Sequence, residues 1–228
     1  GFWPANTVND DDIELYTDET RSEVALTWYG MRQQTEKQVI DGVMRPSRCL
    51  ADFVAPKDSG LKDYVGVFAV TAGLGVEKKE KYFIDDLDDY SAIMLKALAD
   101  RLAEAFAESL HHRARTDLWG YAPDEGLSNE DMIAEKYRGI RPAPGYPACP
   151  DHSVKGPMFD LLACADIGMT LTESLAMMPA ASVSGFYLSH PDATYFNVGK
   201  IGHDQLQDQA ARRMESESDL ERLLAPNL

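Results

Sequence analysis

The sequence lacks the features of a membrane-bound or nucleic-acid-binding protein. It has no apolar run of about 18 residues, and its first residues, Gly1–Pro4, lack the basic-then-apolar layout of a signal peptide. Lys and Arg number 22 against 38 Asp and Glu, so the formal net charge of −16 would repel phosphate groups. Basic residues form only short stretches, such as Arg212–Arg213. We therefore expect a cytoplasmic protein with no nucleic-acid or membrane partner.

Cysteine is also scarce. Cys49, Cys149 and Cys164 are odd in number and far apart, which argues against a disulfide framework and against paired-cysteine zinc sites. Cys149 and His152 have a metal-like spacing, but no second pair lies at a sensible distance, so zinc is not expected. No Ser/His/Asp, Cys/His or clustered metal-ligand pattern stands out either, which leaves an independent enzyme with little support.

Linkers, internal repeats and low-complexity tracts are missing as well. With 228 residues, of which 44% are hydrophobic, the chain can bury a sizeable core. We therefore expect one domain that spans residues 1–228.

The strongest periodic signal predicts a long amphipathic helix over Ser91–Arg115. Its apolar positions recur at three- and four-residue steps: Ile93, Met94, Ala97, Leu98, Leu102, Ala105, Phe106 and Leu110. Acidic residues precede this helix and basic residues end it, as the helix dipole favours. Shorter helices are predicted after the capping boxes Ser128–Asp131 and Ser216–Asp219, and over Met158–Asp166 and Asp204–Met214.

Alternating or β-branched runs predict strands. These runs are Asp12–Tyr16, Val24–Tyr29, Tyr64–Thr71, Ala181–Ser189 and Thr194–Val198. The last two flank His190–Ala193, a natural hairpin turn. Gly73–Gly75 lacks the third glycine and the following helix of a dinucleotide loop, so it is predicted as a plain turn. This order favours an α+β fold with a twisted, largely antiparallel sheet and flanking helices.

One segment combines stiffness with groups that can bind a ligand. Residues 141–150 read RPAPGYPACP, and the four prolines fix φ and extend the residues before them. Gly145 permits close backbone approach, Tyr146 supplies an aromatic face, and Arg141 supplies a fork for a carboxylate. Because remaining amides and carbonyls need partners outside such a loop, they could face a small zwitterion. From these residues alone, a plain surface connector accounts for the loop slightly better than a binding site.

Longer strings carry a resemblance to a known family. The string GIRPAPGYPACPDH at residues 139–152 resembles the activation domain of cobalamin-dependent methionine synthase. Other stretches are similar to that domain in the same order: FWPAN at 2–6, RQQT at 32–35, LADFVAP at 50–56, KALADRLAEA at 96–105, WGYAP at 119–123, SVSG at 182–185 and LAPNL at 224–228. The resemblance therefore covers essentially the whole chain.

The resemblance implies a function. Such a module holds S-adenosylmethionine over a neighbouring cobalamin-binding domain, so that cob(II)alamin can be reduced by flavodoxin or a flavoprotein reductase and then remethylated. The activity belongs to the parent methyltransferase in methionine biosynthesis, and the isolated domain is expected to bind without turnover. The module supplies binding and orientation, while S-adenosylmethionine and cobalamin supply the chemistry.

The resemblance also implies a set of ligand-binding residues. Arg141 is expected to grip the ligand carboxylate, and Tyr146 and Tyr195 to lie beside the ligand. Glu104 and Glu135 are expected near its ammonium group or in supporting hydrogen bonds. The remaining expected contacts are Ala143 and Gly145 through their backbones, and Phe196 through its backbone or ring.

One departure leaves an alternative open. The family's domain normally carries a helical segment ahead of Phe2–Asn6, and nothing in this chain corresponds to it. The chain is therefore interpreted as lacking the N-terminal segment of that domain. The alternative is a ligand-free interaction domain that docks a cobalamin domain or a flavodoxin-type reductase.

Overall fold

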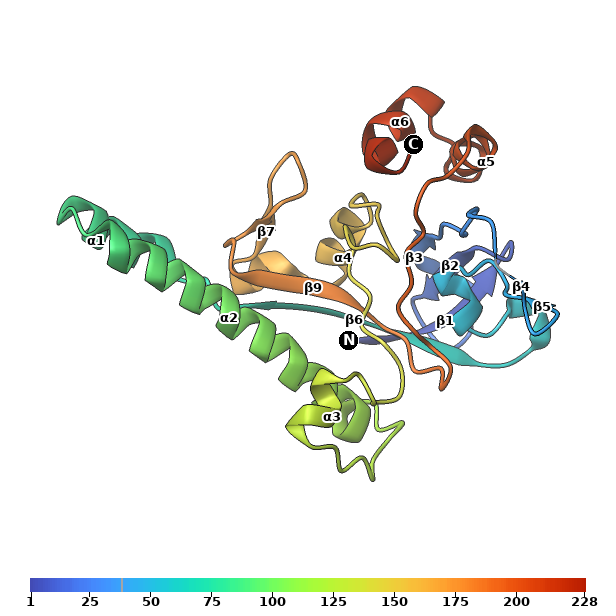
Figure 1. The fold of residues 1–228 in the computed structure, drawn as a ribbon, viewed down its shortest axis with the longest axis horizontal. Helices are drawn as coiled ribbons and strands as arrows, with labels where there is room; N and C mark the ends of the chain where they lie inside the picture. Colours follow the sequence, from blue (N-terminus) through green and yellow to red (C-terminus); the bar gives the residue numbers. More distant parts are fainter. Residues whose placement is uncertain (38) are drawn as a thin grey trace. The chain divides into compact units, whose positions relative to one another are not determined.

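The computed structural model describes residues 1–37 and 39–228 (Figure 1). The chain divides into two compact units, which are described separately. The first unit comprises Gly1, Val67–Tyr137 and Lys155–Gly185, and the second comprises Phe2–Gly66, Arg138–Val154 and Phe186–Leu228.

A five-stranded sheet, in the order β3-β2-β1-β6-β9, organises the fold. Its strands are β1 (Phe2–Val8), β2 (Asp12–Tyr16), β3 (Val24–Tyr29), β6 (Asp63–Thr71) and β9 (Ser182–Tyr187). β1 pairs antiparallel with both β2 and β6, and β2 pairs antiparallel with β3. These pairings and the surrounding helices confirm the predicted α+β class with a largely antiparallel sheet.

The second unit buries side chains of β1, β2 and β3. Ile13, Leu15 and Trp28 are almost completely buried, and the Trp28 ring stacks on Phe186 with centroids 3.9 Å apart. The unit also contains α5 (His203–Arg213), α6 (Glu217–Leu224), β4 (Val39–Ile40), β5 (Val43–Met44) and the 3-10 turns Leu50–Phe53, Lys57–Ser59 and Ala225–Asn227. A second apolar cluster joins α5 and α6 to Met31, Val198 and Ile201.

The first unit is built mainly of helices. Its elements are α1 (Val76–Asp85), α2 (Asp89–Arg113), a π turn (Ala114–Leu118), α3 (Asn129–Ile133), α4 (Lys155–Leu161), the 3-10 turn Cys164–Ile167, β7 (Thr170–Leu171) and β8 (Met177–Met178). Figure 1 shows α1 lying alongside the start of the much longer α2. A salt bridge of 2.7 Å between Lys96 and Glu80 joins these two helices.

The predicted long helix is confirmed, but the face expected to be buried is wrong. Leu98, Leu102 and Phe106 are 55%, 62% and 50% exposed. The buried side of α2 consists instead of Ala92, Ala99, Ala103, Ala107 and His111. Small side chains allow a helix to pack closely, whereas hydrophobic periodicity gives most weight to the large ones.

Both predicted serine N-caps are confirmed, with a full capping box at Ser128 only, and so are most predicted strands. The Ser128 and Ser216 hydroxyls accept bonds from the backbone amides of Asp131 and Asp219. The strand predicted over Thr194–Val198 is wrong, since this stretch has no regular structure and no hairpin with β9. Its backbone is bonded to loops rather than to a neighbouring strand, as Val198 N donating to Pro147 O illustrates.

Several elements escaped prediction, among them the strand β1 and the helix α1. β1 (Phe2–Val8) contains Pro4 and shows little alternation, so it lacked a strand pattern. The turn at Gly73–Gly75 is present, but the expectation that no helix follows is wrong because α1 begins at Val76. None of the helices over residues 1–37 and 39–228 is both long enough and apolar enough to span a membrane.

Candidate functional site

The start of the proline-rich loop lies against the end of β9. Ile140 exchanges two backbone hydrogen bonds with Leu188, at 2.9 and 3.0 Å, and Phe186 N donates to Pro142 O at 2.9 Å. Residues of an antiparallel pair alternate in the direction of their backbone groups, so the N–H of Arg141 points away from β9. That N–H donates to the hydroxyl of Tyr195 at 3.0 Å. The structure therefore brings two of the predicted ligand residues, Arg141 and Tyr195, into direct contact.

The middle of the loop folds back on itself. Tyr146 N donates to Ala143 O, Cys149 N donates to Tyr146 O, and Gly145 N donates to Cys149 O at 2.7 Å. The expectation that the loop's amides lack partners within the loop is therefore wrong for these three groups. The fold-back turns a proline-rich stretch into a closed turn, with Tyr146 61% exposed at its tip.

His152 lies against the glycine of this turn. A Cβ atom placed on Gly145 would lie only 2.1 Å from Cε1 of His152, and Gly145 has φ of +95°. Only glycine can combine that conformation with this approach. The close approach predicted at Gly145 therefore involves the imidazole, which sequence reasoning had considered only as a zinc ligand. Its place directly after the proline-rich string was the signal that could have identified it.

The far end of the loop is fixed by a buried ion pair. Arg213 Nη2 donates to Asp151 Oδ2 at 2.7 Å, and the two side chains are 2% and 5% exposed. Arg213 also donates to Gln209 and Ser153, and its guanidinium lies 5.0 Å from the ring centroid of Tyr29. Sequence reasoning missed this residue's structural role because it had considered Arg213 only as part of a basic stretch.

Phe196 contributes to the hydrophobic core. Its ring packs against the apolar cluster of α5 and α6, which includes Val198 and Leu206. The two contributions expected for Phe196, through its ring or through its backbone, both remain predictions.

Glu104 and Glu135 belong to the first unit. Glu104 lies on α2 and is exposed, and Glu135 follows α3 and is also exposed. Glu135 adopts a left-handed backbone conformation with φ of +54°. This conformation is energetically unfavourable for any residue that has a Cβ atom. Strained residues of this kind are enriched at functional sites.

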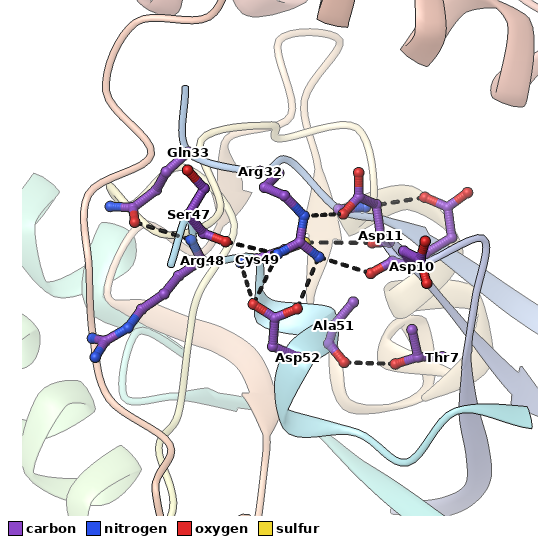
Figure 2. Close-up of polar contacts among 12 residues, drawn as sticks. Thr7, Asp10, Asp11, Arg32, Gln33, Ser47, Arg48, Cys49, Ala51 and Asp52 are labelled. Atoms are coloured by element: carbon purple, nitrogen blue, oxygen red, sulfur yellow. Dashed lines mark hydrogen bonds and ion pairs between the residues drawn. The ribbon is translucent and has the colours of Figure 1, made fainter. Parts of the chain in front are cut away.

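A second polar constellation surrounds Arg32 (Figure 2). Its guanidinium donates to the side chains of Asp11 and Asp52, and to the carbonyls of Asp10 and Ser47, at 2.7–3.0 Å. The hydrogen bond to Asp52 raises the pKa of Arg32, so this cation stays charged. An open groove of about 540 Å³ beside it is lined by Asp11, Arg32, Gln33, Gln34, Ser47, Asp204, Gln205 and Asp208. None of these is a predicted ligand residue.

The sheet, its helices and the hydrogen-bonded loop define a member of the α+β class. The family is that of the activation domain of vitamin B12-dependent methionine synthase, whose sequence model matches residues 1–214, and the chain belongs to it. A solved structure, described as the MetH reactivation domain bound to AdoHcy, is 56% identical with a TM-score of 0.94. The match covers 100% of this chain and 69% of that one. The resemblance stated from the sequence is confirmed.

Proposed function

We propose that this chain binds S-adenosylmethionine and orients its methyl group for the reductive remethylation of cob(II)alamin in methionine synthase. The observation that carries this proposal is the 56% identity, over the whole chain, to a reactivation domain solved with AdoHcy. AdoHcy is S-adenosylmethionine without the transferable methyl group, so a site for one has the shape and polar groups for the other.

The ligand-binding residues remain those expected from the sequence. Arg141 would hold the ligand carboxylate, because a guanidinium presents two parallel donors to a carboxylate. Its backbone supports this role, since Pro142 follows it and the Tyr195 hydroxyl accepts its amide hydrogen. A side chain that starts from a fixed backbone loses less conformational entropy when it binds.

Aromatic and backbone groups would provide further contacts to the ligand. Tyr146 and Tyr195 would lie beside the sulfonium, which a phenol ring attracts through its face. Backbone groups of Ala143, Gly145 and Phe196 would contact the rest of the ligand. Glu104 and Glu135 would lie near the ammonium group, where a carboxylate offsets its charge, or in supporting hydrogen bonds.

The chemistry would come from the bound groups rather than from this chain. S-adenosylmethionine supplies an electrophilic methyl group on a positively charged sulfur, and cobalamin is held by a neighbouring domain of the same enzyme. The chain's contribution would be to bind and orient the ligand. We therefore propose that residues 1–228 form one S-adenosylmethionine-binding module without turnover of its own, and that its partners are the cobalamin-binding domain and flavodoxin or a flavoprotein reductase.

Titration calorimetry of the full chain with AdoHcy and S-adenosylmethionine tests the proposal. Arg141→Ala should weaken binding by about tenfold to a hundredfold, as expected for the loss of a charge-assisted hydrogen bond. Arg222→Ala is a matched control, because Arg222 is an exposed arginine paired with Asp219 on α6. Absence of binding by the unsubstituted chain would overturn the proposal, and equal binding by Arg141→Ala would overturn the site.

A further inference from the structure

The segment that carries Tyr195 has no regular secondary structure to hold it. Residues 192–200 form neither a helix nor a strand. The position of Tyr195 must therefore come from individual bonds to other parts of the second unit. One of these bonds joins Val198 N to Pro147 O, within the loop that also carries Arg141.

Gln33 supplies another such bond. Its side-chain Nε2 donates to the carbonyl of Asn197 at 2.7 Å, only two residues after Tyr195. Its Oε1 accepts from the backbone amide of Arg48 at 3.1 Å and from Nζ of Lys37 at 2.7 Å. The backbone amide of Gln33 donates to the carbonyl of Arg48. Gln33 thus links the Tyr195 segment to the chain around Arg48 with both ends of its amide.

The residues beside Gln33 are fixed in turn, so that it can act as a rigid support. Arg32 N donates to Oε1 of Gln205 at 3.0 Å, and Nε2 of Gln205 donates to Arg32 O at 2.8 Å. The Arg32 side chain is bonded to Asp11 and Asp52 in the constellation of Figure 2, which also draws Gln33 with its bond to Arg48. The charge-assisted bonds from Arg32 to the two carboxylates are strong and geometrically specific.

We propose that Gln33 is a positioning residue for ligand binding, because it holds the Asn197 carbonyl and thereby keeps the Tyr195 hydroxyl on the amide of Arg141. This inference rests on the proposed function for its consequence, although the contact itself is independent of any ligand. Gln33 would touch neither the ligand nor the reacting atoms. Its effect would reach the ligand through Tyr195 and Arg141.

Amide hydrogen exchange measured by NMR on the full chain without ligand tests the contact directly. Gln33→Met keeps the length of the side chain and removes both the donor to Asn197 and the acceptor of Arg48 and Lys37. We expect the Arg141 amide to exchange roughly three to ten times faster, as the loss of one net hydrogen bond implies. The Ile140 amide, which donates to Leu188 in the strand-like pair, should be unchanged.

Two further variants distinguish a specific effect of Gln33 on the Arg141 amide from a general destabilisation of the surrounding structure. Lys37→Met removes the other side-chain partner of Gln33 and should leave the Arg141 amide unchanged. In a Tyr195→Phe background, the Arg141 amide has already lost its acceptor. Gln33→Met should therefore cause almost no further increase in the exchange rate of this amide. An unchanged Arg141 amide in Gln33→Met, or equal acceleration at Arg141 and Ile140, would overturn the inference.

Calorimetry with AdoHcy then tests the consequence for binding. Gln33→Met should weaken binding by roughly three- to tenfold, and by less than about twofold when Tyr195→Phe is present. If the unsubstituted chain binds AdoHcy and Gln33→Met binds equally well, the role of Gln33 is overturned and the proposed function stands. If the unsubstituted chain does not bind, the proposed function itself is overturned.

Discussion

Helix α2 and the coil segment Met31–Thr35 hold their backbones in place by opposite means. α2 makes its backbone hydrogen bonds within itself and leaves much of its apolar surface in solvent. Most of its exposed large apolar side chains follow one ridge at four-residue steps: Tyr90, Met94, Leu98, Leu102 and Phe106. Met31–Thr35 has no regular structure, yet Arg32, Gln33 and Gln34 all bond to distant parts of the second unit.

The backbone conformation of α2 follows from its local sequence, whereas that of Met31–Thr35 depends on tertiary hydrogen bonds. A helix satisfies most of its own backbone groups, so packing of one face, here the alanines of α2, can stabilise it while its larger apolar side chains stay exposed. A coil segment must find a partner for each buried polar group elsewhere, and charged side chains supply several such partners at once. The second unit should therefore depend on a few polar anchors, and α2 on close contacts of its alanines.

The largest effect is expected when a buried anchor of a coil segment is removed. Arg213→Met leaves the carboxylate of Asp151, whose side chain is 5% exposed, without its cation. We expect the free energy of unfolding to fall by about 3–5 kcal/mol, because an unpaired charge is left buried. Chemical denaturation of the full chain measures this value.

Two controls show whether the cost comes from the stranded charge. Arg222→Met removes an exposed arginine and should leave the unfolding free energy nearly unchanged. Adding Asp151→Asn to Arg213→Met removes the unpaired carboxylate and should restore part of the lost free energy of unfolding. If Arg213→Met proves as mild as Arg222→Met, the second unit does not depend on this anchor.

An intermediate effect is expected within α2, at two adjacent residues. Ala103 is 1% exposed and Leu102 is 62% exposed. Ala103→Leu should lower the free energy of unfolding by about 1–3 kcal/mol through overpacking. Leu102→Gln should change it by less than about 0.5 kcal/mol, as surface substitutions do. A large cost for Leu102→Gln in the same denaturation series would mean that this ridge is covered in the folded protein.

The same contrast explains which elements the sequence predicted. The extent of α2 followed from its periodicity to within two residues at each end. Its N-cap, Asp88, is one of the acidic residues expected ahead of the helix, and its carboxylate accepts the amide of Ser91. Its buried face did not follow, because alanine contributes little to a hydrophobic pattern. The strand expected over Thr194–Val198 failed for the converse reason, since its β-forming residues are held by Pro147 and Gln33, which lie far away in the sequence.

The candidate site was predictable only in part. Proline and glycine chemistry identified the loop as stiff, and the family resemblance gave its residues their roles. The contact of Tyr195 with the amide of Arg141 joins residues 54 apart in the sequence, and that of His152 with Gly145 depends on a turn closed by three backbone bonds. Neither local propensity nor spacing encodes such contacts, because they depend on how the loop and its neighbours pack.

The smallest effect is expected at Glu135, where the first unit places a side chain in a left-handed conformation. Glu135→Gly relieves the strain but loosens the unfolded chain, so we expect a net gain of about 0.5–1 kcal/mol in unfolding free energy. Met214→Gly is the matched control, because Met214 has φ of +56°, is 91% exposed and ends α5. Both variants should be stabilised in thermal denaturation, but only Glu135→Gly should bind AdoHcy more weakly in calorimetry. Unchanged affinity in Glu135→Gly would remove Glu135 from the proposed site.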